Sequence, residues 1–218
     1  MQGNDYNYRM FEWSGIFPLM TVLMLLLACT PEYLSEEALK AWIIEQEALT
    51  KSRAYKGFTT QVTYRPTDLL IAQELGGEEA SSTEELQRLE NKYSEYYYFI
   101  LALSRGDKEA LYQAEGGYEQ FSDLVQTLSF RMGQYLNMTT SGQDTIEVAD
   151  YVFPRTYGMG GATNLMFVFN KENAWDDDWI QLNLKEFGMG LGNQTFRFKR
   201  KDLEDVPRIK FKVLSTIK

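Results

Sequence analysis

Apolar positions recur with a helical period along much of the chain between residues 34 and 140. Over 34–53 the polar residue Ser35 stands where an N-cap is expected, and acidic residues follow it in the first turn. The same period predicts helices over 82–104 and 116–138. The apolar stripe of the first helix contains Leu39, Trp42, Ile43 and Leu49, and the capping box of the second is Ser82 with Glu85.

Other segments alternate apolar and polar residues, which is the pattern of a half-buried strand. The stretch 57–66 reads as a strand that stops at Pro66. The next stretch, 67–77, is either a short helix or a second strand, and the glycine pair that ends it favours the helix. After residue 142 the period changes to two, which predicts strands over 145–158, 164–170, 179–188, 194–200 and 208–214.

This order of elements favours an α+β fold. We expect helices mainly in the N-terminal two thirds, packed on a C-terminal antiparallel sheet. The expected organisation is a single domain over 35–218, with a helical part at about 35–140 and a β part at about 144–215.

Composition narrows the classes of partner. The 218-residue chain has a formal net charge of −9 and a sequence pI of about 4.7, so we expect no nucleic-acid partner. From Thr195 to Lys218 the balance reverses, with eight Lys or Arg against three Asp or Glu. We interpret this tail as a solvated strand face with its flanking loop.

Two absences restrict the chemistry. The sequence contains no His, which excludes a Ser-His-Asp triad, a Cys-His pair and an imidazole metal site. Cys29 is the only Cys, which excludes an intrachain disulfide and a thiolate cluster. We therefore expect no metal and no cofactor, and only carboxylate, Lys, Tyr or Ser chemistry remains for an enzyme.

An uncharged apolar run, Ile16–Ala28, precedes that Cys. As a helix it would span roughly 20 Å, against about 30 Å for a bilayer core, which suits the hydrophobic region of a signal peptide. The run ends in Leu26-Leu27-Ala28-Cys29, which resembles the lipobox of bacterial lipoprotein precursors. The alternatives are a buried apolar helix with an inert Cys29 and an uncleaved anchor.

The lipobox resemblance implies both an attachment and a location. Residues 1–28 would be the signal peptide, with Leu26 and Ala28 recognised at the cleavage site. Cys29 would be lipidated and would begin a tether over 29–34. The resemblance implies a cell-envelope protein anchored to a membrane on its periplasmic or surface face. Thr30 after the Cys favours the outer membrane over the inner one.

Two similar glycine segments raise the question of a ligand loop. "YGMGGATN" begins at Tyr157 and "FGMGLGNQ" begins at Phe187, and a strand follows each. Neither fits a dinucleotide loop or a P-loop, because the third glycine and the following helix are missing. We interpret both as turns or bulges between strands. The alternative is a ligand-lining loop with Arg155, Tyr157 and Asn164 as polar contacts.

Acidic residues supply the remaining candidates. "WDDDW", from Trp175 to Trp179, lacks the ligand spacing of a calcium loop and reads as a solvated loop tip. Its two Trp side chains could stack on a sugar, although packing at the sheet edge is the simpler interpretation. Asp150, Asp178 and Glu186 are candidates for a glycosidase pair, but their separation cannot be obtained from the sequence.

Three functions stay open. The body of the chain resembles small lipoproteins of Gram-negative envelopes, in particular uncharacterised Bacteroidota proteins with aromatic-rich acidic domains. The first hypothesis is a non-catalytic envelope lipoprotein that binds a protein partner or supports an assembly. The second is a glycan- or ligand-binding lipoprotein that uses Arg155, Tyr157, Asn164, Trp175 and Trp179. The third is a carboxylate-dependent hydrolase.

Overall fold

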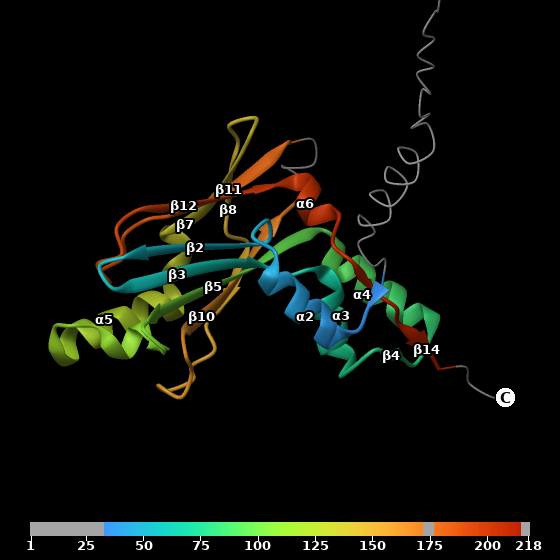
Figure 1. Cartoon of the computed structure of the whole chain (residues 1–218), viewed down its shortest axis with the longest axis horizontal. Coiled ribbons are helices and arrows are strands. Elements are labelled where there is room, and N and C mark those ends of the chain that lie inside the picture. Colours follow the sequence, from blue (N-terminus) through green and yellow to red (C-terminus); the bar gives the residue numbers. More distant parts are fainter. Residues whose placement is uncertain (1–32, 172–176, 215–218) are drawn as a thin grey trace, which may run out of the picture. The chain divides into compact units, whose positions relative to one another are not determined.

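The computed structural model describes residues 33–171 and 177–214, and the chain from Tyr33 onward forms one compact unit. Two larger sheets enclose most of the core, α5 lies at one end of their strands, and α2, α3 and α4 lie at the other (Figure 1). The α-helices of the described ranges are α2 (Glu36–Glu45), α3 (Thr67–Leu75), α4 (Thr83–Ser94), α5 (Gly117–Phe130) and α6 (Arg200–Glu204). Two 3-10 turns, η1 (Ala110–Gln113) and η2 (Met132–Gln134), flank α5.

The first sheet is built around β5, which pairs with three other strands. Its order is β2-β3-β5-β10-β9, with β6 also paired to β5, and every pairing is antiparallel. Its strands are β2 (Thr50–Tyr55), β3 (Phe58–Tyr64), β5 (Tyr96–Arg105), β6 (Lys108–Glu109), β9 (Asp150–Val152) and β10 (Thr163–Asn170). The strand β2 is therefore one edge of this sheet.

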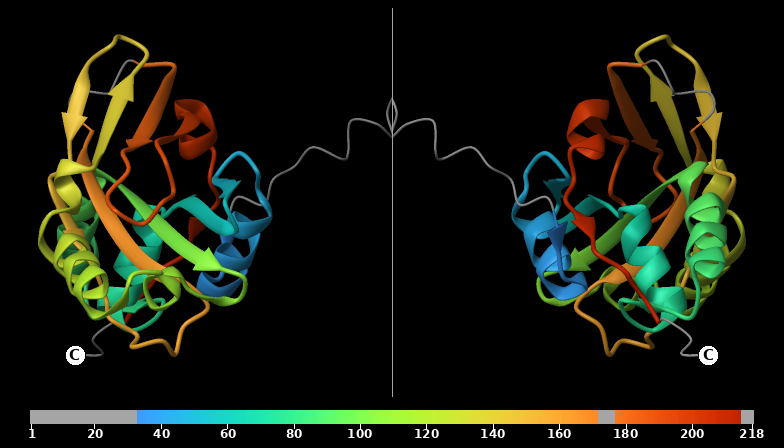
Figure 2. Two further views of the ribbon diagram at one scale, coloured as in Figure 1. Left: turned by 90° about the vertical axis from the view of Figure 1, so that its left-hand side faces the viewer. Right: turned by 90° about the vertical axis from the view of Figure 1, so that its right-hand side faces the viewer.

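The second sheet has the antiparallel order β12-β11-β7-β8. Its strands are β7 (Leu136–Thr140), β8 (Thr145–Glu147), β11 (Trp179–Leu184) and β12 (Gln194–Lys199). The buried side chains of both sheets form one core cluster, and the rings of Phe99 on β5 and Phe198 on β12 lie 5.1 Å apart. The two sheets thus pack against each other, and β12 is an edge of the second one (Figure 2).

Two short parallel pairs join distant parts of the chain. They are β1 (Tyr33–Leu34) with β13 (Arg208–Ile209), and β4 (Glu79–Ala80) with β14 (Lys212–Val213). The C-terminal segment is therefore bound to the N-terminal strand and to the α3–α4 connection.

The α+β class holds in outline, but the expected segregation of helices and strands is wrong. Three strands of the first sheet lie between residues 50 and 105, inside the part expected to be helical, and α6 lies within the part expected to be β. The sheets are therefore built from the whole described chain. The helix expected over 34–53 ends at Glu45, and its last residues belong to β2.

The largest single error concerns the stretch 82–104, which was expected to be one helix. The capping box is present, since the N–H of Glu85 donates to the Ser82 hydroxyl at 3.1 Å. The helix α4 nevertheless ends at Ser94, and the aromatic run that follows is β5. Residues 96–103 of β5 are all apolar or aromatic, because sheet neighbours flank this strand and Tyr93 of α4 packs on Tyr98, so the sequence shows no polar alternation. The helix expected over 116–138 likewise ends at Phe130, and β7 begins at Leu136.

Within the described ranges, no helix combines the length and the apolar composition needed to cross a bilayer.

Candidate functional site

Both glycine segments lie in loops between strands, as predicted, and a carboxylate occupies the backbone donors of each. In the loop after β11, the carboxylate of Glu186 accepts the N–H groups of Gly188 at 2.9 Å and of Gly190 at 2.8 Å, and also that of Gly192. Partial burial raises the pKa of the Glu186 carboxyl, but these N–H groups outweigh that effect and hold the pKa below its usual value. The Glu186 carboxylate therefore occupies the backbone N–H groups with which this loop could otherwise bind an anionic ligand.

The loop between β9 and β10 uses a carboxylate from another element. Glu109 is buried, and its Oε1 accepts the N–H of Gly160 at 2.8 Å and the hydroxyl of Thr156 at 2.6 Å. A Cβ at Gly160 would come within 3.2 Å of the same oxygen, which explains the glycine. At both loops the geometry indicates a structural turn, in which the donors that could hold a phosphate are already bonded.

The proposed ligand contacts do not converge. Arg155 is exposed and donates to the Ser129 hydroxyl at 3.0 Å, and Tyr157 is 70% exposed in the same loop. Asn164 is half-buried on β10 and donates to the C=O of Ala162 at 3.1 Å.

Trp179 is the first residue of β11. The glycine loop precedes the start of β10, whereas Trp179 follows the end of that strand. The eight residues of β10 span roughly 25 Å, so this Trp lies far from the glycine loop. The guanidinium carbon of Arg197 lies 3.8 Å from the centre of the Trp179 ring and covers one face of it. Trp175 lies outside the described residues. Arg155, Tyr157, Asn164 and Trp179 line none of the pockets named below.

The carboxylates suggested for a glycosidase pair are also apart. Asp178 precedes β11 and Glu186 follows it, so eight positions of extended chain, roughly 26 Å, separate them. A glycosidase pair lies within roughly 5 to 9 Å. Asp150 lies on β9 in the other sheet, where its carboxylate accepts the N–H of Tyr151 at 2.8 Å. This arrangement gives no support to catalysis by these residues.

Asp177, within the "WDDDW" stretch, has a structural role. Its carboxylate accepts the hydroxyl of Ser141 and the N–H of Gly142, both at 2.6 Å, and so closes the turn between β7 and β8. Burial raises the pKa of the Asp177 carboxyl, but these two bonds hold it below the usual value. In the part of the chain that the structure describes, no group of three or more acidic or Cys residues is arranged to hold a metal ion.

A polar pocket of about 390 Å³ lies where α3, α4 and α6 meet the C-terminal segment. Asp68 lies in its wall, buried, and binds Arg208. Lys171 donates to the C=O of Ser94 at 2.9 Å, and burial lowers the pKa of its ammonium group. Asp68 and Lys171 already bind other parts of the protein. We therefore interpret this pocket as a structural junction between the helices and the C-terminal segment.

A groove of another kind runs between the edge strands of the two sheets, and we call it the edge groove. Two adjoining pockets, of about 480 and 430 Å³, form it and share Arg53 and Thr195. From β2 and the segment before it the lining residues are Glu47, Thr50, Lys51, Ser52, Arg53, Ala54 and Tyr55, and from the β12 side they are Leu191, Gly192, Asn193, Gln194, Thr195, Phe196 and Arg197.

The outer edge of β2 carries backbone groups that β3 does not bind. Residues 56–57, both at positive φ, form a two-residue hairpin turn, so Tyr55 and Phe58 are the first hydrogen-bonded pair. Bonded pairs alternate along an antiparallel ladder. The N–H and C=O groups of Ser52 and Ala54 therefore point away from β3, and among the described residues no other strand binds them.

The outer edge of β12 has the same property. Just beyond the ladder, the N–H of Arg200 donates to the C=O of Asp178 at 3.0 Å, which makes this a hydrogen-bonded pair. By the same alternation, the backbone groups of Thr195, Arg197 and Lys199 face away from β11. Within the described ranges, no strand pairs with this edge either.

Side chains, and not backbone bonds, span the space between the two edges. The ammonium of Lys51 lies 5.9 Å from the centre of the Phe198 ring. At the other end, a Cβ built on Gly192 would lie 3.7 Å from the Tyr55 ring. Since Lys51 lies near the start of β2 and Phe198 near the end of β12, the two edges run antiparallel to each other.

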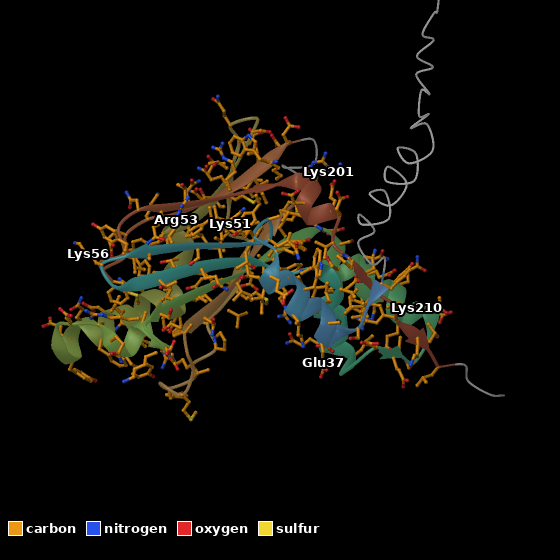
Figure 3. The ribbon with its side chains drawn as sticks, in the orientation of Figure 1. Glu37, Lys51, Arg53, Lys56, Lys201 and Lys210 are labelled. Carbon is orange, nitrogen blue, oxygen red and sulfur yellow. The ribbon has the colours of Figure 1, made fainter. Side chains whose placement is uncertain are left out.

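The edge groove is basic although the protein as a whole is acidic. Its walls contain three cations, Lys51, Arg53 and Arg197, and one carboxylate, Glu47. Lys56 follows at the end of β2, as Figure 3 shows. None of these four cations forms an ion pair with another described residue. Arg197 instead donates two hydrogen bonds to the Gln181 side chain and stacks on Trp179, so the cations of β2 are the ones open to a bound partner.

This groove was not predicted from the sequence. Residues 50–53 are polar and were predicted to end a helix, and the basic tail was interpreted as a solvated strand face. One signal was present, namely cations at positions 51 and 53, spaced two residues apart as on one face of a strand.

A scan against protein-family models finds no match, and a search of curated proteins finds none. Among solved structures, the chain is similar to a protein from Burkholderia pseudomallei K96243, described as a novel protein of unknown function. The two share 9% identity, and the match covers 80% of this chain and 94% of that one with a TM-score of 0.35. A likeness at this level supports no conclusion about fold or function.

Proposed function

We propose that this chain is a non-catalytic envelope lipoprotein that binds a protein partner through the edge groove. One observation carries the binding part of the proposal: two sheet edges that no described strand pairs with face the same groove, with backbone donors and acceptors directed into it. An extended segment of another protein binds such an edge by adding a strand to the sheet. Native proteins usually cover or block their edges, so a pair of open edges lining one groove favours a binding role.

The anchoring part of the proposal rests on the lipobox at Leu26–Cys29, which lies outside the described residues. The described domain begins at Tyr33, four positions after that Cys. Lipidation at Cys29 would therefore hold the domain on a short tether at a membrane, with the outer membrane favoured by Thr30. One acyl chain binds a membrane reversibly, so a stable anchor requires more than one.

The absence of catalysis is inferred from how the buried and loop carboxylates are used. Glu109, Glu186 and Asp68 each accept hydrogen bonds that hold a loop or a chain segment in place. A carboxylate bonded in this way is a poor general acid or nucleophile, because proton transfer would break the structure that it supports.

Labelling of cells with an alkyne analogue of palmitate tests the anchor. We expect the full chain to incorporate the label and to fractionate with membranes, and Cys29→Ala to lose both properties. A wild-type protein that stays unlabelled and keeps residues 1–28 would remove the anchor from the proposal.

A photo-crosslinking residue at Ser52 tests the binding surface, with the same residue at the exposed Glu37 on α2 as the control site. We expect one discrete adduct from Ser52 and none from Glu37. The adduct should disappear with Ala54→Pro, which removes one outward N–H, and persist with Ala54→Val. Equal adducts at both sites, or an adduct insensitive to Ala54→Pro, would contradict the assignment of the partner to the edge groove.

A further inference from the structure

The charge and the backbone geometry of the edge groove together specify its occupant. We propose that the edge groove binds a single extended acidic segment of a partner protein, which inserts as a strand between β2 and β12. This inference rests on the proposed function, and it adds the chemistry and the binding mode of the partner.

The hydrogen-bonding groups determine the mode of binding. One edge offers the N–H and C=O groups of Ser52 and Ala54, and the other offers those of Thr195 and Arg197. A strand placed between them could bond to both edges at once and join the two sheets. Because β2 and β12 run antiparallel to each other, this strand would be parallel to one edge and antiparallel to the other.

The side chains determine the chemistry of the segment. Arg53 is exposed and forms no ion pair with a described residue, and Lys51 and Arg197 lie on the two sides of the groove. Opposite charges on neighbouring strands attract, and like charges directly opposite each other repel. Lys51 and Arg53 share one face of β2, the face on which β3 carries buried Val62 and Thr60. A partner strand with Glu or Asp at every second position would place its carboxylates on one face, beside Lys51 and Arg53.

The same charges disfavour a second copy of this chain as the occupant. Two β2 edges brought together would place Lys51 and Arg53 beside the same cations of the other copy, and two β12 edges would do the same with Arg197 and Lys199. Basic residues on an edge strand are a known means of preventing such self-pairing. An acidic segment removes this repulsion.

Two side chains must move when the segment binds. The Lys51 ammonium now lies over the Phe198 ring, and the Tyr55 ring lies against Gly192. The side chains of Lys51 and Tyr55 extend from β2, which is half-buried or exposed, so each can change to another rotamer. The Tyr55 side chain is 47% exposed and would be more buried by an inserted strand, which provides a local probe of binding.

Fluorescence anisotropy of a labelled octapeptide, Thr-Glu repeated four times, tests the proposal with the full chain in detergent micelles. We expect saturable binding that weakens as salt is raised from 50 to 500 mM, because exposed charges are screened. The Thr-Lys octapeptide should not bind. A Thr-Glu peptide methylated on alternate backbone nitrogens should bind at least about tenfold more weakly, because it lacks half of its donors.

Charge-reversal variants assign the site. Lys51→Glu combined with Arg53→Glu should weaken binding of the Thr-Glu peptide at least about tenfold. The matched control, Lys201→Glu combined with Lys210→Glu, reverses two exposed cations outside the groove and should bind like the wild type. Circular dichroism of each variant checks that the fold is retained, and Ala54→Pro with Ala54→Val repeats the test without a change of charge.

Each contrary result has a defined meaning. Equal binding of the methylated and unmodified peptides would replace strand addition with simple polyanion attraction and overturn the proposal. Dimers in sedimentation experiments that Ala54→Pro dissociates would assign the groove to self-association and overturn it as well. If the peptide fails to bind while the Ser52 crosslink persists, the acidic chemistry is wrong and the proposed function stands.

Discussion

Arg208 and Asp68 lie 140 positions apart in the chain, yet the Nε of Arg208 donates to the Asp68 carboxylate at 2.8 Å. The same oxygen of Asp68 accepts the N–H of Ile209 at 2.7 Å. Asp68 is only 3% exposed at the start of α3, so one buried carboxylate holds β13 against this helix. The C-terminal segment thereby becomes part of the helical end of the domain.

Replacement of Asp68 should therefore destabilise the whole domain. Asp68→Ala leaves the N–H of Ile209 without its acceptor and Arg208 without its buried partner, and we expect a loss of about 2 to 3 kcal/mol in the free energy of unfolding. Urea denaturation followed by circular dichroism measures this loss. Glu90→Gln is the control, because Glu90 contacts Arg208 only at 3.8 Å on its solvent side and should change stability by no more than about 0.5 kcal/mol. Equal effects of the two changes would contradict this role of Asp68.

The Glu186 loop should make stability depend on pH. The folded protein holds the pKa of Glu186 below 4.5, its value without the loop, so the folded state binds fewer protons than the unfolded state in this range. Its contribution is complete above about pH 4.5 and is lost as the pH falls through the folded-state pKa. Urea denaturation of the wild type and Glu186→Gln between pH 3 and 7 should show a difference that is largest at the upper end and shrinks toward acid. A difference that does not vary with pH would exclude this carboxylate as the cause.

Glu109 should control the loop between β9 and β10. In Glu109→Ala, the N–H of Gly160 and the hydroxyl of Thr156 lose their shared acceptor, and the loop should open. Trypsin should then cut after the exposed Arg155 several times faster than in the wild type, as mass spectrometry of the fragments can show. Glu109→Gln keeps an acceptor oxygen and should stay close to the wild-type rate. If Glu109→Ala is cut no faster, the loop is held by other contacts.

The contact of Phe99 with Phe198 should account for much of the packing between the two sheets. Both rings are essentially buried, and truncation of a buried Phe costs about 3 to 5 kcal/mol because it leaves a cavity. Phe99→Ala should show a loss of that size in urea denaturation. Phe130→Ala, which truncates a side chain that is 78% exposed, should change stability by no more than about 0.5 kcal/mol. Similar effects for both would argue against a core between these sheets.

The sequence predicted those elements whose period and caps agree. The helix α3, the strand β3 and the later strands β10, β11 and β12 all lie where apolar spacing places them. The first turn of α4 was also found, because Ser82 and Glu85 form a local hydrogen-bonded cap that needs no tertiary contact.

The strands β5 and β2 could not be read from periodicity, for opposite reasons. Residues 96–103 of β5 are all apolar or aromatic, so their sequence shows no polar alternation and matches a buried helix as well as a strand. Their aromatic residues favoured the strand and were given too little weight. The strand β2 is half-buried or exposed throughout, so it has no apolar face to detect.

The candidate site was missed because it depends on tertiary structure. The cations at 51 and 53 line the same groove as Arg197 only because the edges of two different sheets face each other in the fold. No local pattern can reveal which strands become edges. The glycine loops, by contrast, attracted attention through local sequence, and their donors turn out to be bonded within the protein.

The parallel pairing of β1 with β13 determines how the domain would respond to a mechanical load. Tension that enters at Tyr33 along the axis of β1 acts on two adjacent residue pairs, Tyr33 with Arg208 and Leu34 with Ile209. The hydrogen bonds between β1 and β13 run across the direction of such a force, so they are loaded together in shear. In a hairpin that is pulled from its end, by contrast, the bonds open one at a time. Part of the force would then reach Asp68 through Ile209, so that tension at the amino end would also load the C-terminal segment.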